Sequence, residues 1–268
     1  MSNCKVIALT NQKGGVGKTT TAVNLGVGLV QQGKKVLLID ADAQANLTMA
    51  LGYNRPDDIP ITLSTVMQNI IDDKSLDVSQ GIIHHSEGVD LLPSNIELSG
   101  FEVRLINAMS RERVLKTYVN EVKKNYDYVL IDCMPSLGMI TINALAAADS
   151  VIIPTQPHYL SAKGLELLLR SVSMVKRQIN PKLRIDGILM TMVMPRTNIS
   201  KEITATVKSA YGQKIKVFDT EIPHSIRAVE ATAEGKSIFA YDKSGKVAAA
   251  YEQFGKEVAE IGEKQRNQ

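Results

Sequence analysis

The sequence predicts an α/β fold, in which a mostly parallel, twisted sheet is covered by helices on both faces. Short apolar segments rich in β-branched residues alternate with segments of helical periodicity along the 268 residues, which is typical of βαβ units. Hydrophobic residues make up 44% of the chain, enough for a substantial core. The chain contains no long linker, low-complexity tract or internal repeat. We therefore expect one domain over residues 1–268, with a polar C-terminal tail at about 262–268.

The first elements are a strand, a glycine-rich loop and a helix. Lys5–Thr10 is a short β-branched apolar segment, and Thr20–Gly33 carries apolar residues at helical spacing and ends at a glycine. This order directs backbone N–H groups and a helix N-terminus toward one point, which favours a bound phosphate chain. Lys18 would contact the β- and γ-phosphates, and the Thr19 hydroxyl would bind Mg²⁺. The segment therefore predicts a fold of the P-loop NTPase type.

The loop departs from the usual phosphate-loop pattern. Gln12 stands where that pattern has a glycine, and a second lysine, Lys13, comes directly before Gly14. The segment Lys13–Thr19 resembles the deviant Walker A motif of the ParA/MinD family of ATPases. This resemblance implies that Lys13 reaches across a dimer interface to the phosphates of the other subunit, whereas the alternative is a solvated loop charge. The nucleotide contacts expected in the loop are Lys13, Gly14, Gly15, Val16, Gly17, Lys18, Thr19 and Thr20.

Strand-like segments recur along the rest of the chain. They are Lys34–Asp42, Val89–Ser94, Tyr126–Pro135, Ser150–Pro157, Arg184–Val193 and Ile215–Pro223. Between them lie helical patterns such as Ser161–Asn180, which ends before Pro181. Ligands of parallel sheets bind beyond the carboxyl ends of the strands, and the motifs that follow are found at such ends.

The second strand ends in two acids, Asp40 and Asp42. Mg²⁺-dependent hydrolysis needs a residue that orients water in line with the γ-phosphate, and a carboxylate is suited to this. The family resemblance gives Asp42 this catalytic role, beside Lys13 and Lys18, and places Asp40 near the water shell of the metal. The alternative is that both acids are ordinary strand-end or helix-cap residues.

The strand Tyr126–Pro135 contains Asp132 after four apolar residues. An acid at this position is the expected Walker B ligand, which holds Mg²⁺ through water. The predicted metal-site residues are thus Thr19, Asp132 and Asp40. Cys133 is expected to be a small buried residue rather than a nucleophile, because the segment offers no His or Lys to lower its pKa.

Two further segments concern the base of the nucleotide. The segment Met192–Ser200 resembles the family segment around the adenine, where Asn198 would contact the base, and Pro223 should also lie close to it. Arg196 to Asn198 would equally make an ordinary loop and helix cap. Gln156 and His158 lie in a segment that resembles the second switch of the family, and neither is given a role.

Basic residues follow Pro223 in a segment that resembles the DNA-binding region of partition ATPases. Arg227 matches an arginine of that branch, and three lysines follow. Non-specific DNA binding is mostly neutralisation of phosphates, so the expected DNA contacts are Arg227, Lys236, Lys243 and Lys246. Glu230, Glu234 and Asp242 are interleaved with them, and the alternative is a solvated charged face.

Composition limits the other classes. The net charge is +3 and the pI about 8.7, which permits a local nucleic-acid patch without requiring one. The two cysteines, Cys4 and Cys133, have neither disulfide nor metal-ligand spacing, which fits a reducing cytoplasm. The apolar stripe Val247, Tyr251, Phe254, Val258 and Ile261 is expected to pack in the core, so stable membrane binding is not expected. Only four residues precede the first strand, and we expect no N-terminal helix-turn-helix.

These features predict a small ATPase for chromosome or plasmid partition, with ATP and Mg²⁺ as cofactors. The expected partners are a second copy of the chain in an ATP-dependent homodimer, non-specific DNA, and a ParB-like centromere-binding protein that stimulates hydrolysis. The expected localisation is cytoplasmic and nucleoid-associated. Three alternatives stay open: a MinD-like membrane-cycling ATPase, a metabolic ATP-dependent ligase or kinase, and an ATP-bound scaffold with negligible turnover.

Overall fold

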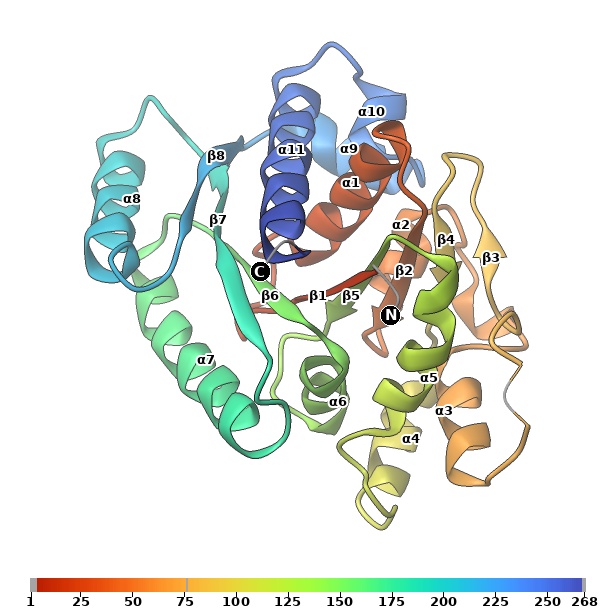
Figure 1. Cartoon of the computed structure of the whole chain (residues 1–268). Helices are drawn as coiled ribbons and strands as arrows, with labels where there is room; N and C mark the ends of the chain where they lie inside the picture. Colours follow the sequence, from red (N-terminus) through yellow and green to blue (C-terminus); the bar gives the residue numbers. More distant parts are fainter. Residues whose placement is uncertain (1–3, 76, 267–268) are drawn as a thin grey trace.

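A single sheet organises the chain. Figure 1 shows the computed structural model, which describes residues 4–75 and 77–266. Within those ranges eight strands form one sheet in the order β3-β4-β2-β5-β1-β6-β7-β8. The strands are β1 (Lys5–Leu9), β2 (Val36–Ala41), β3 (Ile83–His84), β4 (Asp90–Leu92), β5 (Tyr128–Cys133), β6 (Ser150–Thr155), β7 (Arg184–Val193) and β8 (Val217–Pro223).

The sheet is mostly parallel, as the sequence predicts. Among the described residues only β3 runs antiparallel to its neighbour, β4. Every position of β1, β2, β5 and β6 is buried, because helices cover both faces of these central strands. The sequence pattern missed β3, a two-residue edge strand in which Ile83 is half-buried and His84 exposed. So short a segment carries no periodicity to detect.

Helices pack on both faces of the sheet (Figure 1). One face is covered by α1 (Lys18–Gln31), α2 (Asn46–Ala50), α9 (Ile226–Ala233), α10 (Ile238–Tyr241) and α11 (Lys246–Arg266). The other is covered by α3 (Leu63–Ile71), α4 (Glu97–Leu105), α5 (Val114–Val122), α6 (Met139–Ala147), α7 (Tyr159–Gln178) and α8 (Asn198–Tyr211). Short 3₁₀ turns lie at Pro56–Asp58 and Lys123–Asn125.

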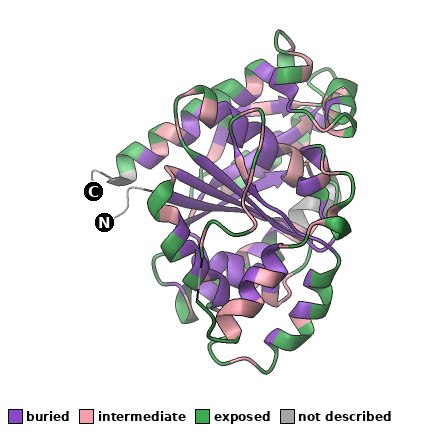
Figure 2. Cartoon of the chain, turned by 90° about the vertical axis from the view of Figure 1, so that its right-hand side faces the viewer, coloured by how far each residue is buried: buried purple, intermediate pink, exposed green. Residues whose placement is uncertain are grey.

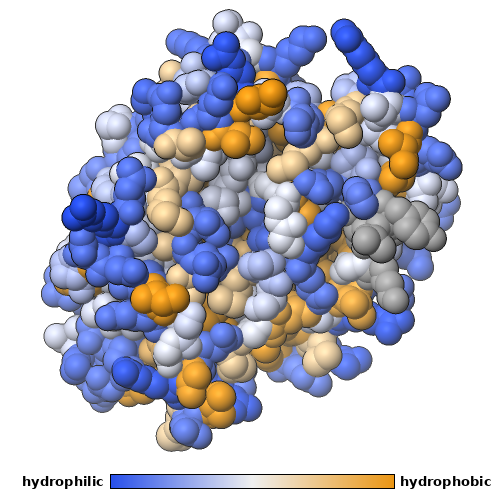
Figure 3. All heavy atoms as spheres, turned by 180° about the vertical axis from the view of Figure 1, so that it is seen from behind, coloured by the Kyte–Doolittle hydropathy of each residue, from blue (hydrophilic) through white to orange (hydrophobic). Residues whose placement is uncertain are grey.

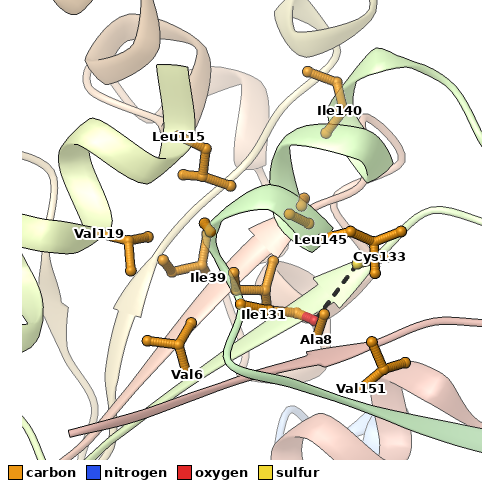
Figure 4. Close-up of a cluster of buried hydrophobic side chains, with 14 of the residues drawn as sticks. Val6, Ala8, Ile39, Leu115, Val119, Ile131, Cys133, Ile140, Leu145 and Val151 are labelled. Carbon is orange, nitrogen blue, oxygen red and sulfur yellow. Dashed lines mark hydrogen bonds between the residues drawn. The ribbon is translucent and has the colours of Figure 1, made fainter. Parts of the chain in front are cut away.

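Alternation along β1 divides the core into two layers. Val6 and Ala8 belong to the hydrophobic cluster beneath α3 to α8, whereas Ile7 and Leu9 belong to the cluster beneath α1 and α11. This follows from the two-residue period of a strand. Figure 4 shows part of the first cluster, in which Val6 and Ala8 lie near side chains of neighbouring strands and of α5 and α6.

Buried residues fill the sheet and the inward sides of the helices, and exposed residues lie on the outside (Figure 2). Seen from behind, the surface is mostly hydrophilic, and hydrophobic side chains form separate groups (Figure 3). Within residues 4–75 and 77–266 we find no helix with the length and apolar character of a membrane span.

The C-terminal helix α11 is part of the core. Val247, Tyr251, Phe254 and Val258 are buried, and Ile261 packs against them, which confirms the predicted core stripe. The helix continues to Arg266, so the part of the expected polar tail that the structure describes is helical.

The sheet order brings distant motifs to one edge. Since β5 lies between β2 and β1, Asp132 is the register neighbour of both Asp40 and Leu9. The glycine loop follows Leu9 directly and leads into α1. The predicted phosphate loop and two of the predicted acids therefore lie side by side at the carboxyl ends of three adjacent strands.

Candidate functional site

The phosphate loop has the backbone shape that its glycines permit. Gly15 and Gly17 have φ of 71° and 80°, a left-handed region that other residues avoid. Gly17 is the N-cap residue of α1 and brings no side chain to the amides of the first turn. These amides and the positive end of the helix dipole are thus directed to the space in front of the loop.

Lys18 places a cation in that space. It is the first residue of α1 and is buried, and its Nζ lies 3.4 Å from the carbonyl oxygen of Lys13. Burial lowers the pKa of Lys18, and the nearby charges of Asp132 and Asp42 act in the opposite direction. Lys13 itself is half-buried, and its N–H donates to Asn11 Oδ1 at 3.0 Å.

Thr19 and Asp132 meet across the loop. The Thr19 hydroxyl donates to Asp132 Oδ2 at 2.7 Å. The other carboxylate oxygen, Oδ1, is buried and has no hydrogen-bond partner within the described residues. Burial, together with the neighbouring charge of Asp40, raises the pKa of Asp132. A hydroxyl beside a carboxylate with an unsatisfied oxygen fits hydrated Mg²⁺, which binds such oxygens and retains several waters.

The carboxylate of Asp40 is hydrogen-bonded to neighbouring groups of the protein. Its carboxylate accepts hydrogen bonds from the Asp42 N–H at 3.2 Å and from the N–H and hydroxyl of Thr48 at 2.8 and 2.7 Å. The Thr48 hydroxyl in turn accepts a bond from the Ser94 N–H. Asp40 therefore fixes α2 and the end of β4 relative to Asp42. Its placement near a metal's water shell stays a prediction.

Asp42 faces the same cavity as the loop. The cavity has a volume of about 590 Å³. Its lining includes Gly14, Gly15, Gly17, Lys18, Thr19, Thr20, Asp42 and Gln44. Asp42 Oδ1 accepts a hydrogen bond from the Gln44 N–H at 2.9 Å. The structure thus brings most predicted nucleotide residues and Asp42 into one space.

A second cavity of about 400 Å³ adjoins the first and shares Gly17, Thr20 and Met192 with it. Pro223 and Ile222 line it, together with residues of α9 and α11. Its largely apolar walls suit a flat base. Asn198 is exposed at the start of α8 and is absent from the described lining of this cavity. Of the two residues expected near the base, Pro223 therefore lines this cavity and Asn198 is not in its described lining.

Three residues of this edge had no assigned role in the sequence. Gln156 and Thr191 donate to loop carbonyls, and Met192 has a φ of 52° and lines both cavities. Each lies at or just beyond the end of β6 or β7. All three lie close to the carboxyl ends of predicted strands, and this position is the sequence signal that could have indicated them.

The predicted DNA-binding residues lie on α9, in the turns on either side of α10 and at the start of α11. Arg227, Lys236, Lys243 and Lys246 are all exposed. The guanidinium of Arg227 lies 5.9 Å from the ring centre of Tyr241 and 3.8 Å from Glu230. Lys236 pairs with Glu234 at 2.8 Å.

Cys133 is buried beside Asp132, and burial raises the pKa of its thiol. Its Sγ lies 3.8 Å from the Ile131 carbonyl oxygen (Figure 4). A protonated buried thiol is a poor nucleophile, so the prediction of a small packing residue is confirmed.

A strand, a glycine loop and a helix, with Lys18 and Thr19 opposite a buried acid on an adjacent strand, define a P-loop NTPase. The family model described as "AAA domain" matches residues 4–185. The chain is 44% identical to the sporulation initiation inhibitor protein Soj of Bacillus subtilis, over 96% of this chain and 99% of that protein. It is 38% identical to the chromosome partitioning protein ParA of Myxococcus xanthus, over 95% and 87%. The chain belongs to the ParA/MinD family of P-loop ATPases.

A solved structure agrees with this assignment. Cobyrinic acid a,c-diamide synthase from Mycobacterium smegmatis, with a bound ATP analogue and magnesium, superposes with a TM-score of 0.82. It is 35% identical and covers 94% of this chain and 93% of that one. The phosphate-loop fold predicted from the sequence is therefore confirmed.

The buried acids predict how stability responds to pH. Burial raises the pKa of Asp40 and Asp132 above the ordinary value of about 4. Between the ordinary and the raised pKa, the folded state holds protons that the unfolded state has released. The free energy of unfolding without nucleotide or Mg²⁺ should therefore fall as pH rises above about 4, by up to about 1.4 kcal/mol per pH unit for each acid.

Urea denaturation across pH 4 to 8 measures this slope. Asp132→Asn should make it shallower, whereas Asn at the exposed Asp219 should not. A free energy of unfolding that rises with pH over this range, and is unaffected by Asp132→Asn, would contradict the buried-acid account.

Proposed function

We propose that this protein is an ATP-dependent dimeric switch for chromosome or plasmid partition. The proposal depends above all on one observation, which is that the phosphate loop, Lys18, Thr19 and Asp42 line one cavity. In addition, the Thr19 hydroxyl is hydrogen-bonded to the carboxylate of Asp132. The relatives named as Soj and ParA share nearly the full length of this chain. They give the switch its proposed task.

ATP would bind with its phosphates on the loop. The amides around Gly15 and Gly17 and the Lys18 ammonium group would hold the β- and γ-phosphates. Thr19 and Asp132 would hold Mg²⁺, which would neutralise charge on the phosphates. Asp42, which lines the same cavity, would orient the attacking water. The base would occupy the apolar cavity beside Pro223.

Lys13 would act in the partner subunit. Lys13→Ala should leave ADP affinity within about twofold of the wild type, because Lys18 and the loop amides stay in place. Dimerisation with a slowly hydrolysed ATP analogue should weaken about tenfold or more, as expected when a charge-assisted contact to phosphate is lost. Analytical ultracentrifugation measures the dimer and nucleotide titration the affinity. The exposed loop residue Lys35 supplies a matched alanine control. A dimer and turnover equal to those of the wild type would return Lys13 to a solvated charge.

The ATP-bound dimer would bind DNA without sequence preference, since dimerisation doubles the basic surface around Arg227. The decisive experiment is DNA binding at one salt concentration with ATP, ADP and no nucleotide. ATP should raise the affinity, and the affinity should fall steeply with salt because counterions are released from phosphates. Equal binding without nucleotide would refute the switch.

Arg227→Ala should weaken binding to every DNA sequence alike. The slope of log affinity against log salt should become shallower by about one unit for each lost phosphate contact. ATP binding and dimerisation should persist, because Arg227 is exposed on the outer side of α9. Arg184→Ala is a matched control, since this exposed arginine lies at the amino end of β7, whereas Arg227 follows the carboxyl end of the parallel neighbour β8. DNA affinity and salt slope equal to those of the wild type would remove Arg227 from the DNA surface.

A ParB-like centromere-binding protein would accelerate hydrolysis and release the dimer from DNA, which would give a nucleoid-associated cytoplasmic cycle. Turnover measured with DNA alone, with the partner alone and with both tests this step. Stimulation that requires both supports it.

A metabolic ligase is the second candidate, because a structurally similar protein of 35% identity has the name of a cobyrinic acid diamide synthase. Such an enzyme would couple ATP hydrolysis to glutamine or ammonia and a carboxylate substrate. Turnover that responds to these compounds and not to DNA would favour it. The membrane-cycling alternative is less favoured, because the apolar stripe of α11 is buried in the core.

A further inference from the structure

The phosphate loop is held from behind by two side chains of neighbouring strands. Gln156, directly after β6, donates through Nε2 to the Gly15 carbonyl oxygen at 2.8 Å. Thr191, near the end of β7, donates through its hydroxyl to the Val16 carbonyl oxygen at 2.8 Å, and this bond is buried. Two successive carbonyl groups of the loop are thereby fixed.

The start of the loop is tied to the same strand. Asn11 donates to the Pro154 carbonyl oxygen at 2.8 Å and accepts a hydrogen bond from the Lys13 N–H at 3.0 Å. The backbone is therefore anchored to β6 on both sides of Gly14. A glycine-rich loop without such anchors would lose much conformational entropy on binding phosphate.

Met192 supports this arrangement. Its φ of 52° is unusual for a residue other than glycine. Its Sδ is contacted by Gln156 Nε2, and its Cε lies 3.6 Å from the position that a β-carbon on Gly17 would occupy. Gln156 and Thr191 therefore donate to the carbonyls of Gly15 and Val16, and Met192 lies beside Gly17.

The orientation of the carbonyls decides that of the amides. A peptide group is planar, and its N–H and C=O point in opposite directions. Holding the Gly15 and Val16 carbonyls toward β6 and β7 directs the N–H groups of Val16 and Gly17 away from them, toward the cavity. A loop fixed in this way binds phosphate without first becoming ordered.

We propose that Gln156 and Thr191 are positioning residues that hold the phosphate loop in its nucleotide-binding shape. This inference rests on the proposed function, because it takes the loop to be the phosphate site. Neither residue is among the described residues lining the 590 Å³ cavity, although Thr191 lines the adjoining 400 Å³ cavity. Both hold loop carbonyls, so they should affect affinity for any nucleotide that carries a β-phosphate. Gln156 is in the described lining of neither cavity, so its substitution isolates the effect of the loop.

The test removes each donor without adding charge. Gln156→Met keeps the length of the side chain, and Thr191→Val keeps its shape. Each should raise the ADP and ATP dissociation constants about fivefold, the equivalent of one net hydrogen bond. Turnover at saturating ATP should stay within about twofold, because the contact is the same in the ground and transition states. Thr191→Ser, which restores the hydroxyl, should recover most of the affinity.

Matched controls lie far from the loop. Gln178→Met changes an exposed glutamine at the end of α7, and Thr206→Val changes an exposed threonine on α8; both should bind nucleotide like the wild type. Hydrogen exchange measures the loop separately, because a change in overall stability would not alter the exchange of the loop amides alone. Amides of residues 14–17 should exchange faster in Gln156→Met without nucleotide and should regain protection with saturating ADP.

The outcomes separate this inference from the proposed function. A wild type that does not bind ATP would refute the phosphate site itself. A wild type that binds, with Gln156→Met and Thr191→Val equal to it in affinity and loop exchange, would overturn only the positioning role. So would a large loss of turnover at saturating ATP with unchanged affinity. If Thr191→Val does not fold, the half-exposed Gln156 keeps the test decisive.

Discussion

Replacement of Lys18 by alanine should abolish stable ATP binding. Lys18 is buried at the first position of α1 and lines the same cavity as the loop glycines and Asp42. In the proposed function, its ammonium group contacts the β- and γ-phosphates. In a partly buried site, loss of such a contact should raise the ATP dissociation constant about 100-fold or more.

Equilibrium titration with a fluorescent ATP analogue measures this change. The fold of the variant can be checked by its melting temperature, which should not fall, since burial already lowers the pKa of Lys18 and its removal relieves a desolvated charge. Lys35→Ala serves as the control, because Lys35 is exposed. Wild-type affinity in Lys18→Ala would end the phosphate-loop assignment.

The Asp42→Ala variant should bind ATP and dimerise, but its rate of ATP hydrolysis should fall by about 100-fold or more. Asp42 lines the cavity but follows β2, so it is not part of the phosphate loop. Its removal should therefore affect the attacking water rather than the bound phosphates. Single-turnover hydrolysis measures the chemical step. In the proposed cycle DNA release follows hydrolysis, so the variant should also stay on DNA longer than the wild type.

Asp42→Asn separates chemistry from local structure. Asparagine can still accept the hydrogen bond from the Gln44 N–H that Asp42 Oδ1 accepts in the structure. It cannot take a proton from water. Hydrolysis as slow as in Asp42→Ala would assign the effect to water positioning. Recovery of the wild-type rate in Asp42→Asn, or loss of ATP binding in Asp42→Ala, would make Asp42 a structural residue.

The three acids Asp40, Asp42 and Asp132 show how much of the site the local sequence pattern could predict. The strand and loop preceding each acid indicated that Asp42 and Asp132 lie at an edge of the sheet, and both do. The sequence pattern did not indicate that both carboxylate oxygens of Asp40 accept hydrogen bonds from Asp42 and Thr48. The hydrogen bonds to Thr48 depend on α2, a five-residue helix that is too short to give a periodic pattern in the sequence.

The base and DNA residues show the same limit. Pro223 ends β8 and lines the apolar cavity, whereas Asn198 begins α8 outside its described lining. Both were placed by similarity of short segments, which does not decide which side of a loop faces the ligand. The approach of Arg227 to Tyr241 likewise depends on how α9 and α10 pack.

The sequence by itself determined the class of site, because strand, glycine loop, Lys18 and Thr19 are consecutive and their geometry is local. Only the tertiary structure decided what holds that loop in place. Gln156 lies 141 positions from Gly15, and Thr191 lies 175 positions from Val16. Their hydrogen bonds exist because β6 and β7 follow β1 in the sheet. Strand order is set by packing of the whole chain, which the pattern of any one segment does not contain.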